Sequence, residues 1–561
     1  MYKMQENFTK FVIFIKILLL LLFYVITQTD MVIAQSLKPK INNFSDSEAL
    51  IESEEHVNLN KPDYSALITV SKGLNPLGLD SSDSKSFSLN DALNTAIHNN
   101  LTLKINFTGF KSKEWLFYSS LGKFLPDILM SYNDRYLKGD PNLPGFGKIN
   151  VDTPFIITTA GFRQYVYQGG KVLFGAMQAK NMQKAQLFNY KATTNDVLLQ
   201  TVKLYNDLLL NQALLRIRIR AVNISKEQLS NNVDMQENGI ATKLDVLQSK
   251  TQLSKDRQQL IAQQVASRVA SVQLSSYLNI NMADNLNPIE TVLVKHRLVN
   301  ASMNIAKLLQ IAIDNRYELK QYEQLRLAAK KAIIIATSPL QPNVQLFGNI
   351  YGIGPTLGNK TLYTKPNYAP VALAGTTTSS TAMAPIQTGL SPVTLPMASS
   401  YSPVGAAFIP PIAYNSHLGA LYTIGFGINW NFLGLGVTDT ANIQSAKWLA
   451  KQAQHQATAQ LISVLEQVRT AYLNSLAAEK EIEETTDQVI SAEQELEFAK
   501  LRMQNGVGRN IDVLQAQLDR TTALLSKSQA IINFNNAQAQ LLHDIGMINI
   551  QTLTAKIPLK M

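Results

Sequence analysis

Histidine and cysteine are the side chains that most often bind metals or act as nucleophiles, and this sequence offers few of them. It contains six histidines and no cysteine. Without cysteine there can be no disulfide, thiolate metal site, iron–sulfur cluster or cysteine nucleophile. The histidines show neither i, i+4 pairing nor other metal-ligand spacing; they are His56, His98, His296, His417, His455 and His543. We therefore expect no catalytic residue, no cofactor, no metal site and no enzymatic activity.

Phosphate and nucleic-acid binding also receive little support. The segment Gln168-Gly169-Gly170-Lys171 is similar in composition to a phosphate loop, but it lacks the full spacing and follows an aromatic strand. Lysine and arginine exceed aspartate and glutamate by 51 − 41 = 10. This excess is spread thinly, without a dense basic run, which argues against a nucleic-acid partner.

The first segment has the features of a secretory signal peptide, predicted over residues 1–34. Lysines flank or enter the apolar run 11–26, and the small residue Ala34 precedes the expected cleavage site. A transmembrane anchor is the alternative, but the run is shorter than the ~20 residues of a spanning helix. Residues 35–87 are polar and lack periodicity, so we expect a disordered leader. The mature protein should leave the cytoplasm without a lipid anchor.

The sequence contains an internal duplication. Residues of the first half recur 216 positions later: Leu93, Ile97, Asn99 and Pro126 as Leu309, Ile313, Asn315 and Pro342. Others recur 267 positions later: Tyr205, Asn238-Gly239 and Asp245 to Gln248 as Tyr472, Asn505-Gly506 and Asp512 to Gln515. Two constant offsets predict two homologous halves, 88–300 and 301–548, with 267 − 216 = 51 inserted residues and a tail, 549–561.

Each half predicts the same order of elements. A helix, two strands, a very long helix and a further helix are expected at 88–122, 127–136, 156–167, 171–237 and 242–280. Their second-half counterparts are 303–336, 343–352, 420–432, 438–504 and 510–546. The insertion, 354–418, is poor in charge and rich in serine, threonine and proline. We expect it to be a flexible surface loop between the two second-half strands.

Strand 420–432 carries a membrane signal. Apolar residues alternate with small and polar ones, and Tyr422, Trp430 and Phe432 would form an aromatic girdle. A half-buried strand of a soluble sandwich alternates in the same way, which is the alternative. A membrane sheet must close, and the smallest barrels have about eight strands. Four strands per chain cannot close, whereas three chains would supply twelve.

The long helices predict supercoiled packing. Apolar residues spaced by seven run along each of them: Leu208, Leu215, Val222 and Leu229, then Ile482, Val489, Leu496 and Met503. A helix over 171–237 would be about 100 Å long at ~1.5 Å per residue. We predict a mainly α fold with a membrane β part, in which three chains form a twelve-helix α-barrel joined to a twelve-strand β-barrel.

The order and spacing of these motifs resemble the TolC family of outer-membrane efflux and secretion channels. The resemblance covers about 88–547 and lies in the opening Ser88 to Leu93, in Leu125-Pro126, in Tyr165 to Gly170, and in the duplicated Asn-Gly and Asp-Val-Leu-Gln motifs. It implies a homotrimer that crosses the outer membrane and extends into the periplasm as the passive exit duct of a tripartite efflux or type I secretion system. The implied partners are a periplasmic adaptor, an inner-membrane RND or ABC transporter, and outer-membrane lipid.

The resemblance also assigns roles to the turns after the long helices. Adaptor-docking turns would be formed by Asn238, Gly239, Asn505, Gly506 and Gly508, although a glycine is needed there simply to reverse the chain. An acidic aperture ring would be formed by Asp512, with Asp245 as its first-half counterpart. Both aspartates could instead be first-turn residues that complement a helix dipole. The family's gating Tyr, Arg and second Asp fall on Met503, Gly508 (with Arg509 adjacent) and Gln515, so the resemblance does not carry the family's gating bonds over to this sequence.

A trimeric surface adhesin with a barrel anchor is the rival function. An adhesin would carry its barrel strands once, at the C-terminus, whereas here strands interrupt the helices in each half. The duplication therefore favours the channel. Efflux of drugs and secretion of proteins both remain open.

Overall fold

The computed structural model describes residues 84–140, 142–143, 147–148, 151–282, 284–354, 361–363, 367–370, 406–409, 413–415 and 419–555. The predicted signal peptide, 1–34, and all of the predicted leader before Ser84 lie outside these residues. Among the helices of the described part, none is both long enough and apolar enough to span a membrane.

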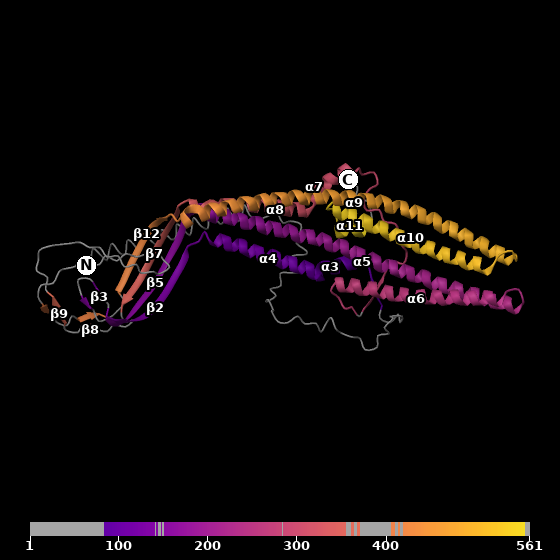
Figure 1. Cartoon of the computed structure of the whole chain (residues 1–561), viewed down its shortest axis with the longest axis horizontal. Coiled ribbons are helices and arrows are strands. Elements are labelled where there is room, and N and C mark those ends of the chain that lie inside the picture. Colours follow the sequence, from indigo (N-terminus) through magenta and orange to yellow (C-terminus); the bar gives the residue numbers. More distant parts are fainter. Residues whose placement is uncertain are drawn as a thin grey trace. The chain divides into compact units, whose positions relative to one another are not determined.

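The two halves have the same order of helices and main strands (Figure 1). The first half consists of α3 (Leu89–Asn99), α4 (Leu101–Gly122), β2 (Asp127–Gly139), β5 (Val151–Gln168), α5 (Lys171–Glu237) and α6 (Lys243–Tyr277). The second consists of α7 (Ile305–Asn315), α8 (Tyr317–Thr337), β7 (Asn343–Gly354), β12 (Gly419–Asn429), α9 (Val437–Gln504) and α10 (Asn510–Asp544). The predicted bounds of α5 are those observed, and α9 begins one residue earlier than expected.

The first helix of each half is broken, where the sequence predicted one continuous helix. The breaks fall at Asn100 and Arg316, which are 216 positions apart and have nearly the same backbone angles, φ −62°, ψ 125° and φ −58°, ψ 122°. Asn100 caps the following helix, because its side-chain oxygen accepts hydrogen bonds from the backbone nitrogens of Thr102 (2.9 Å) and Leu103 (3.3 Å). Arg316 makes no cap bond with its side chain and is buried instead.

Short ordered segments extend both ends of the duplicated region. Ser84–Phe87, which we assigned to the disordered leader, forms strand β1 and pairs in parallel with β6 (Asn285–Pro288). Phe87 is buried, and its carbonyl oxygen accepts a hydrogen bond from the Tyr205 hydroxyl at 3.2 Å. In the predicted tail, helix α11 (Ile550–Ala555) buries Leu553. Each segment buries one apolar side chain, Phe87 or Leu553, and a single apolar residue gives no periodic pattern in a sequence.

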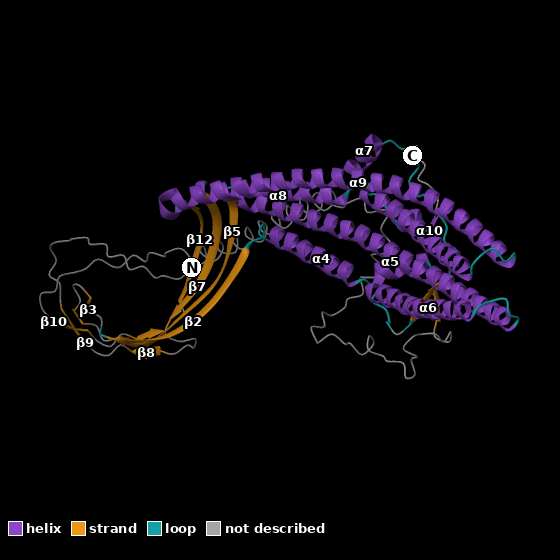
Figure 2. Cartoon of the chain, turned by 45° about the vertical axis from the view of Figure 1, so that its right-hand side comes forward, coloured by secondary structure: helices purple, strands orange, loops and turns teal. Residues whose placement is uncertain are grey.

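The four main strands form one antiparallel sheet in the order β12-β7-β5-β2 (Figure 2). The register brings exposed apolar side chains onto one face. One row across the sheet is Ile128, Phe162, Gly348 and Ile424, and the next is Met130, Ala160, Ile350 and Tyr422. Ile128, Met130 and Phe426 are each 74% exposed or more in the single chain. This face is the lipid-facing candidate that alternation in 420–432 predicted.

Two irregularities explain why the other strands alternate less clearly. The register of β5 against β7 shifts between Tyr165 and Tyr167, which leaves Val166 as the bulged residue and moves later side chains to the other face. Gly348 lies beside Phe162, and a Cβ at this glycine would be 2.7 Å from Phe162 Cε1. The Phe162 ring thus covers the space beside Gly348, so β7 needs no apolar side chain of its own at this position.

Two buried clusters hold the helices together around α5. One joins α3, α5, α7, α9 and α10 through residues such as Leu93, Leu198, Leu308, Val464 and Leu542. The other packs Tyr205 and Leu208 of α5 against Leu274 of α6 and Leu286 of β6. The heptad positions of both long helices are buried or half-buried, as supercoiled packing requires. The predicted mainly α fold with an antiparallel β part is confirmed for the single chain, and its assembly into twelve-membered barrels stays a prediction.

The predicted loop insertion, 354–418, has paired strands at its two flanks. Strand β8 (Thr361–Tyr363) pairs with β11 (Ala413–Asn415), and β9 (Asn367–Pro370) pairs with β10 (Ala406–Ile409), both antiparallel. The flanks of the insertion are therefore β-ladders, and not the loop we expected; residues 371–405 lie outside the described part.

Deletion of residues 358–415 should leave assembly and transport intact. Among its described residues, the first-half connection has just the two-residue strands β3 (Asn142–Leu143) and β4 (Gly147–Lys148), so we expect the sheet not to need the longer ladder. Gel filtration of the detergent-solubilised deletion variant, together with a transport assay, checks this. Loss of oligomer would show that the ladders are structural.

Candidate functional site

The turns that follow the long helices have the same geometry in both halves. Gly239 and Gly506 have φ of 76° and 72°, the left-handed conformation that a helix C-terminal reversal needs. In the first turn the Ile240 nitrogen donates to Met235 O at 2.8 Å, and in the second the Val507 nitrogen donates to Arg502 O at 3.0 Å. Each helix therefore ends in a Schellman turn, and the predicted docking turns are structurally equivalent.

Gly508 is required for a different reason. A Cβ at this position would lie 2.8 Å from the Met503 nitrogen and 2.9 Å from the Arg502 carbonyl carbon, so a side chain would collide with the backbone of α9. Gly508 lets the chain pass close to the helix it has just left.

Each turn carries an exposed apolar side chain: Val507 lies within the predicted second turn but was not singled out, and Ile240 was not predicted. Ile240 is 72% exposed and Val507 is 69% exposed. They are 267 positions apart, the same offset that revealed the duplication, so that offset could have identified them. Paired exposed apolar residues at equivalent positions are typical of a contact surface.

The two candidate aperture aspartates occupy equivalent positions in the first turns of α6 and α10. Asp245 Oδ2 accepts from the Thr242 nitrogen at 2.9 Å and from the Thr242 hydroxyl at 2.6 Å. Asp512 accepts from the Arg509 nitrogen at 3.3 Å and from Arg509 Nη2 at 3.0 Å. The hydrogen bonds from Arg509 lower the pKa of the Asp512 carboxyl. The geometry is that of residues that start a helix; an aperture ring remains a prediction.

Asn510 links the two halves close to these aspartates. It is 3% exposed, and its Oδ1 accepts from Asn232 Nδ2 at 2.8 Å and from Gln228 Nε2 at 3.3 Å. Its Nδ2 donates to the Asp245 carbonyl oxygen at 3.1 Å. One side chain at the start of α10 thereby holds α5 and α6 and brings Asp245 close to the turn that carries Asp512.

Met503 and Gln515, which occupy the positions of two of the TolC family's gating residues, make other contacts in this chain. Gln228 Nε2 lies 3.9 Å from Met503 Sδ, a contact between the two halves. Gln515 Nε2 donates to Asp519 Oδ1 at 3.0 Å, one turn along its own helix. Gln515 thus has an acceptor in its own helix.

The predicted aromatic girdle lies at one end of strand β12 and in its middle. Tyr422 lies within the strand and is 67% exposed. Trp430 and Phe432 lie beyond its last residue, Asn429, because the strand is shorter than the predicted 420–432. Their rings stack at a centroid distance of 6.4 Å, and Trp430 Nε1 donates to the Leu340 oxygen at 3.3 Å. An exposed aromatic pair with one indole hydrogen bond fits an interfacial position.

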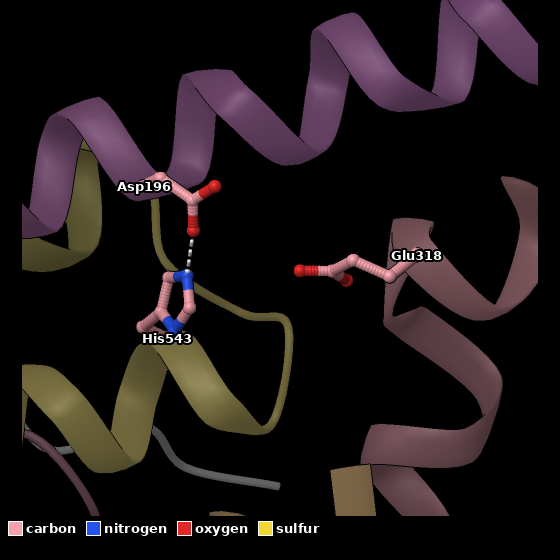
Figure 3. A group of neighbouring side chains, drawn as sticks. All are labelled: Asp196, Glu318 and His543. Carbon is pink, nitrogen blue, oxygen red and sulfur yellow. Dashed lines mark hydrogen bonds and ion pairs between the residues drawn. The ribbon is translucent and has the colours of Figure 1, made fainter. Parts of the chain in front are cut away.

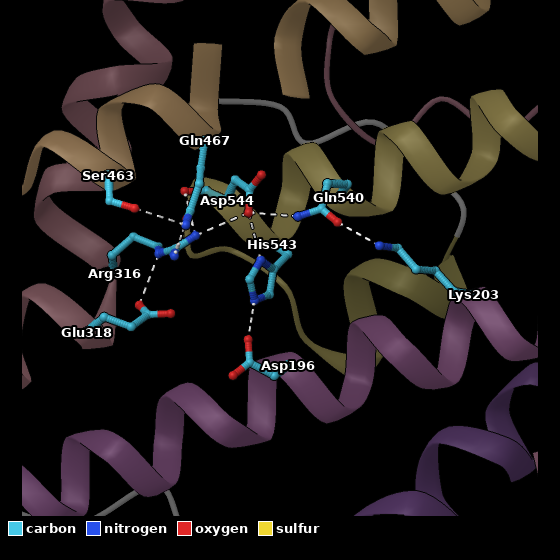
Figure 4. Close-up of polar contacts among 9 residues, drawn as sticks. All are labelled: Asp196, Lys203, Arg316, Glu318, Ser463, Gln467, Gln540, His543 and Asp544. Atoms are coloured by element: carbon cyan, nitrogen blue, oxygen red, sulfur yellow. Dashed lines mark hydrogen bonds and ion pairs between the residues drawn. The ribbon is translucent and has the colours of Figure 1, made fainter. Parts of the chain in front are cut away.

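A buried polar network lies where α5, α8, α9 and α10 meet (Figure 4). Arg316, at the break before α8, is 4% exposed and donates to Asp544 Oδ1 (3.2 Å), to Glu318 Oε2 (3.0 Å) and to Gln467 Oε1 (2.8 Å). His543 bridges two acids: its Nδ1 is 2.8 Å from Asp544 Oδ1 and its Nε2 is 2.8 Å from Asp196 Oδ1. The network ties the first half to the second.

The network brings a histidine close to several carboxylates, two of which lie far from it in the sequence. Burial alone would lower the pKa of His543, but the hydrogen bonds to Asp196 and Asp544 outweigh it, and the pKa is raised. Figure 3 shows Asp196, Glu318 and His543, whose ligand-type atoms all lie within 4.8 Å of one another. The sequence predicted no metal-ligand grouping, because these three residues come from helices that are far apart along the chain.

The comparisons with known proteins agree with this geometry. The sequence profile of the family "Outer membrane efflux protein" matches residues 414–546. No curated protein matches the chain by sequence.

Solved structures match over most of the chain. The outer-membrane channel CmeC of Campylobacter jejuni is 15% identical with a TM-score of 0.66, over 87% of this chain and 94% of that one. VceC of Vibrio cholerae is 16% identical with a TM-score of 0.64, over 82% and 96%. The open state of MtrE from Neisseria gonorrhoeae is 14% identical with a TM-score of 0.61, over 82% and 89%.

The fold is therefore the one seen in outer-membrane channels of the TolC type. Within it, residues 414–546 carry the sequence of the outer membrane efflux protein family, so the resemblance to the TolC family is confirmed. The family match also confirms the predicted outer-membrane location. The family model that matches residues 414–546 and the similar solved structures are of channel proteins, which supports a role other than that of an enzyme.

Proposed function

We propose that the chain is the exit duct of a tripartite efflux or type I secretion system, assembled as a homotrimer. The observation that supports this best is the open sheet. Within the described sheet, β2 and β12 are the two edge strands, and one face is apolar and exposed. Hydrocarbon cannot satisfy an open edge, so β2 of one chain pairs with β12 of the next, and three chains close a twelve-strand barrel.

The proposed duct meets its partners at the turns after the long helices. A periplasmic adaptor would contact Ile240 and Val507 together with the turn residues Asn238, Gly239, Asn505, Gly506 and Gly508. An inner-membrane RND or ABC transporter would supply the energy, because the duct performs no chemistry of its own. Neighbouring genes distinguish the two systems: an adaptor with a proton-driven pump indicates efflux, and an adaptor with an ATP-driven transporter indicates secretion.

The domain order disfavours the adhesin. In both halves two strands lie between the short helices and the long helix, so the sheet interrupts the helices twice. An adhesin needs its membrane anchor only once.

Native mass measurement of the detergent-solubilised protein tests the proposal. We expect three chains per particle with intact β-structure, and ion conductance after reconstitution into planar bilayers. A monodisperse monomer with intact β-structure would contradict the closure argument, and a trimer without conductance would contradict the channel.

Two substitutions at the start of α10 should change ion selectivity in opposite directions. Threefold symmetry would bring three Asp512 carboxylates toward one axis, where they attract cations. Asp512→Ala should weaken cation selectivity and block by a trivalent cation, whereas Arg509→Ala should strengthen both because it removes the guanidinium that pairs with the carboxylate. Asp245→Ala should have a smaller effect. Bilayer recordings measure all three.

A different result would show that Asp512 acts only at the start of helix α10. It is unchanged selectivity and block in Asp512→Ala together with a lower melting temperature. That result would not contradict the proposed trimer or its ion conductance.

A further inference from the structure

We propose that each chain binds one divalent transition-metal ion of the zinc class through His543 Nε2 and the carboxylates of Asp196 and Glu318. The three residues come from α10, α5 and α8, and their ligand-type atoms lie within 4.8 Å of one another (Figure 3). Figure 3 also shows the Glu318 carboxylate pointing toward the other two side chains. One imidazole nitrogen with two carboxylates is a ligand set that suits zinc and its neighbours better than magnesium or calcium. The inference rests on these side chains and not on the proposed channel function.

Asp544 and its hydrogen-bond partners hold the imidazole in the orientation that a metal ligand needs. His543 is 7% exposed, and its Nδ1 lies 2.8 Å from Asp544 Oδ1. Asp544 is in turn fixed by Arg316 Nη1 at 3.2 Å and by Gln540 Nε2 at 2.9 Å. A carboxylate that accepts a hydrogen bond from Nδ1–H leaves the Nε2 lone pair free and makes it more basic, as in the carboxylate–histidine–zinc arrangement. Nε2 faces Asp196 and the Glu318 carboxylate.

The formal charge of the network also calls for a divalent cation. It contains three carboxylates, Asp196, Glu318 and Asp544, but only one guanidinium, Arg316. With a neutral His543, two negative charges are left uncompensated, and a divalent ion offsets both. Lys203 contacts the network through Gln540, whose Oε1 accepts a hydrogen bond from Lys203 Nζ at 2.8 Å. Protonation of His543 would offset a single charge, and that cationic histidine is the competing arrangement.

The site is reachable and needs little movement. The Asp196 side chain is 60% exposed, whereas His543 and Glu318 are 8% and 18% exposed, so an ion can enter on the Asp196 side and keep a water there. Zinc bonds of about 2.0–2.2 Å in a tetrahedral site put ligand atoms about 3.3 Å apart. His543 Nε2 and Asp196 Oδ1 are already 2.8 Å apart. Glu318 can turn one oxygen to the ion while Oε2 keeps its bond from Arg316 Nε.

Titration of the metal-stripped, full-length oligomer in detergent with Co²⁺ tests the inference. We expect saturable visible d–d absorption with one Co²⁺ per chain, abolished by equimolar Zn²⁺, and a melting temperature that rises with Zn²⁺. Asp196→Asn and Glu318→Gln should each weaken the apparent affinity at least ~10-fold, and His543→Gln should remove the Co²⁺ spectrum. His455→Gln, an exposed position on α9, should bind as the wild type does.

Asp196→Asn keeps the experiment decisive if the buried variants fail to fold, because its side chain is the most exposed of the three. Circular dichroism and oligomer mass confirm that it is folded. Absence of saturable binding in the wild type, equal affinity in folded Asp196→Asn, or loss of binding in His455→Gln would each overturn the site and leave His543 as a cation between two acids.

Discussion

Replacing Arg316 by methionine should lower the free energy of unfolding by about 3–5 kcal/mol. The guanidinium is 4% exposed and donates to Asp544, which is 3% exposed, to Glu318 and to Gln467. Methionine fills a similar volume but leaves Asp544 as a buried charge with no guanidinium beside it. The midpoint of denaturant unfolding of the detergent-solubilised oligomer measures the loss.

Arg326→Met is the matched control for this prediction. Arg326 lies on α8 and pairs with Glu323 at 2.8 Å, but both side chains are exposed, 37% and 47%. An exposed pair of this kind contributes about 1 kcal/mol or less. Equal losses in the two variants would show that burial of Arg316 does not determine its contribution.

Replacing Asn510 by alanine should open the periplasmic mouth and destabilise the fold by about 1–3 kcal/mol. The substitution leaves the donors of Asn232 and Gln228 and the carbonyl oxygen of Asp245 without their partner in a buried position. Because Asn510 joins the second-half helix pair to the first-half pair, its loss lets the two pairs separate. Single-channel conductance in planar bilayers should therefore increase.

Asn533→Ala provides the control on the same helix. Asn533 is half-buried and accepts only from Gln529, one turn away, so its removal breaks no bond between the halves. Conductance should stay at the wild-type level. If Asn510→Ala lowers stability but leaves conductance unchanged, the network holds the fold and does not hold the aperture.

The features that sequence reasoning found are those that local patterns encode. The ends of α5 at Lys171 and Glu237 follow from glycines on either side of an apolar heptad, and the turns at Gly239 and Gly506 follow from repeated Asn-Gly pairs. Strand 420–432 was predicted from its alternation, and strands 127–136 and 343–352 from the prolines that precede them. Each of these features can be predicted from a pattern within one short stretch of sequence.

The features that it missed depend on contacts between distant residues. The break at Arg316 lies inside a segment with uninterrupted helical periodicity, and what holds it is Asp544 at the end of α10. His543 was read as one of six scattered histidines, because Asp196 and Glu318 reach it only when three helices pack. Asp512 was placed correctly at the start of α10, but its partner Arg509, three positions earlier, was not anticipated.

The edge strands β2 and β12 set the order of events in biogenesis. Each has a neighbour on only one side within the described sheet, and each carries apolar residues on its exposed face. A newly exported chain therefore presents two adhesive edges while it is still in water, which is the condition under which β-rich proteins aggregate. In the proposed homotrimer such a chain cannot enter the bilayer alone, because its sheet edges close only against other subunits, so insertion would coincide with association of the subunits. The yield of functional channel should then depend steeply on chain concentration and on periplasmic chaperones that cover these edges.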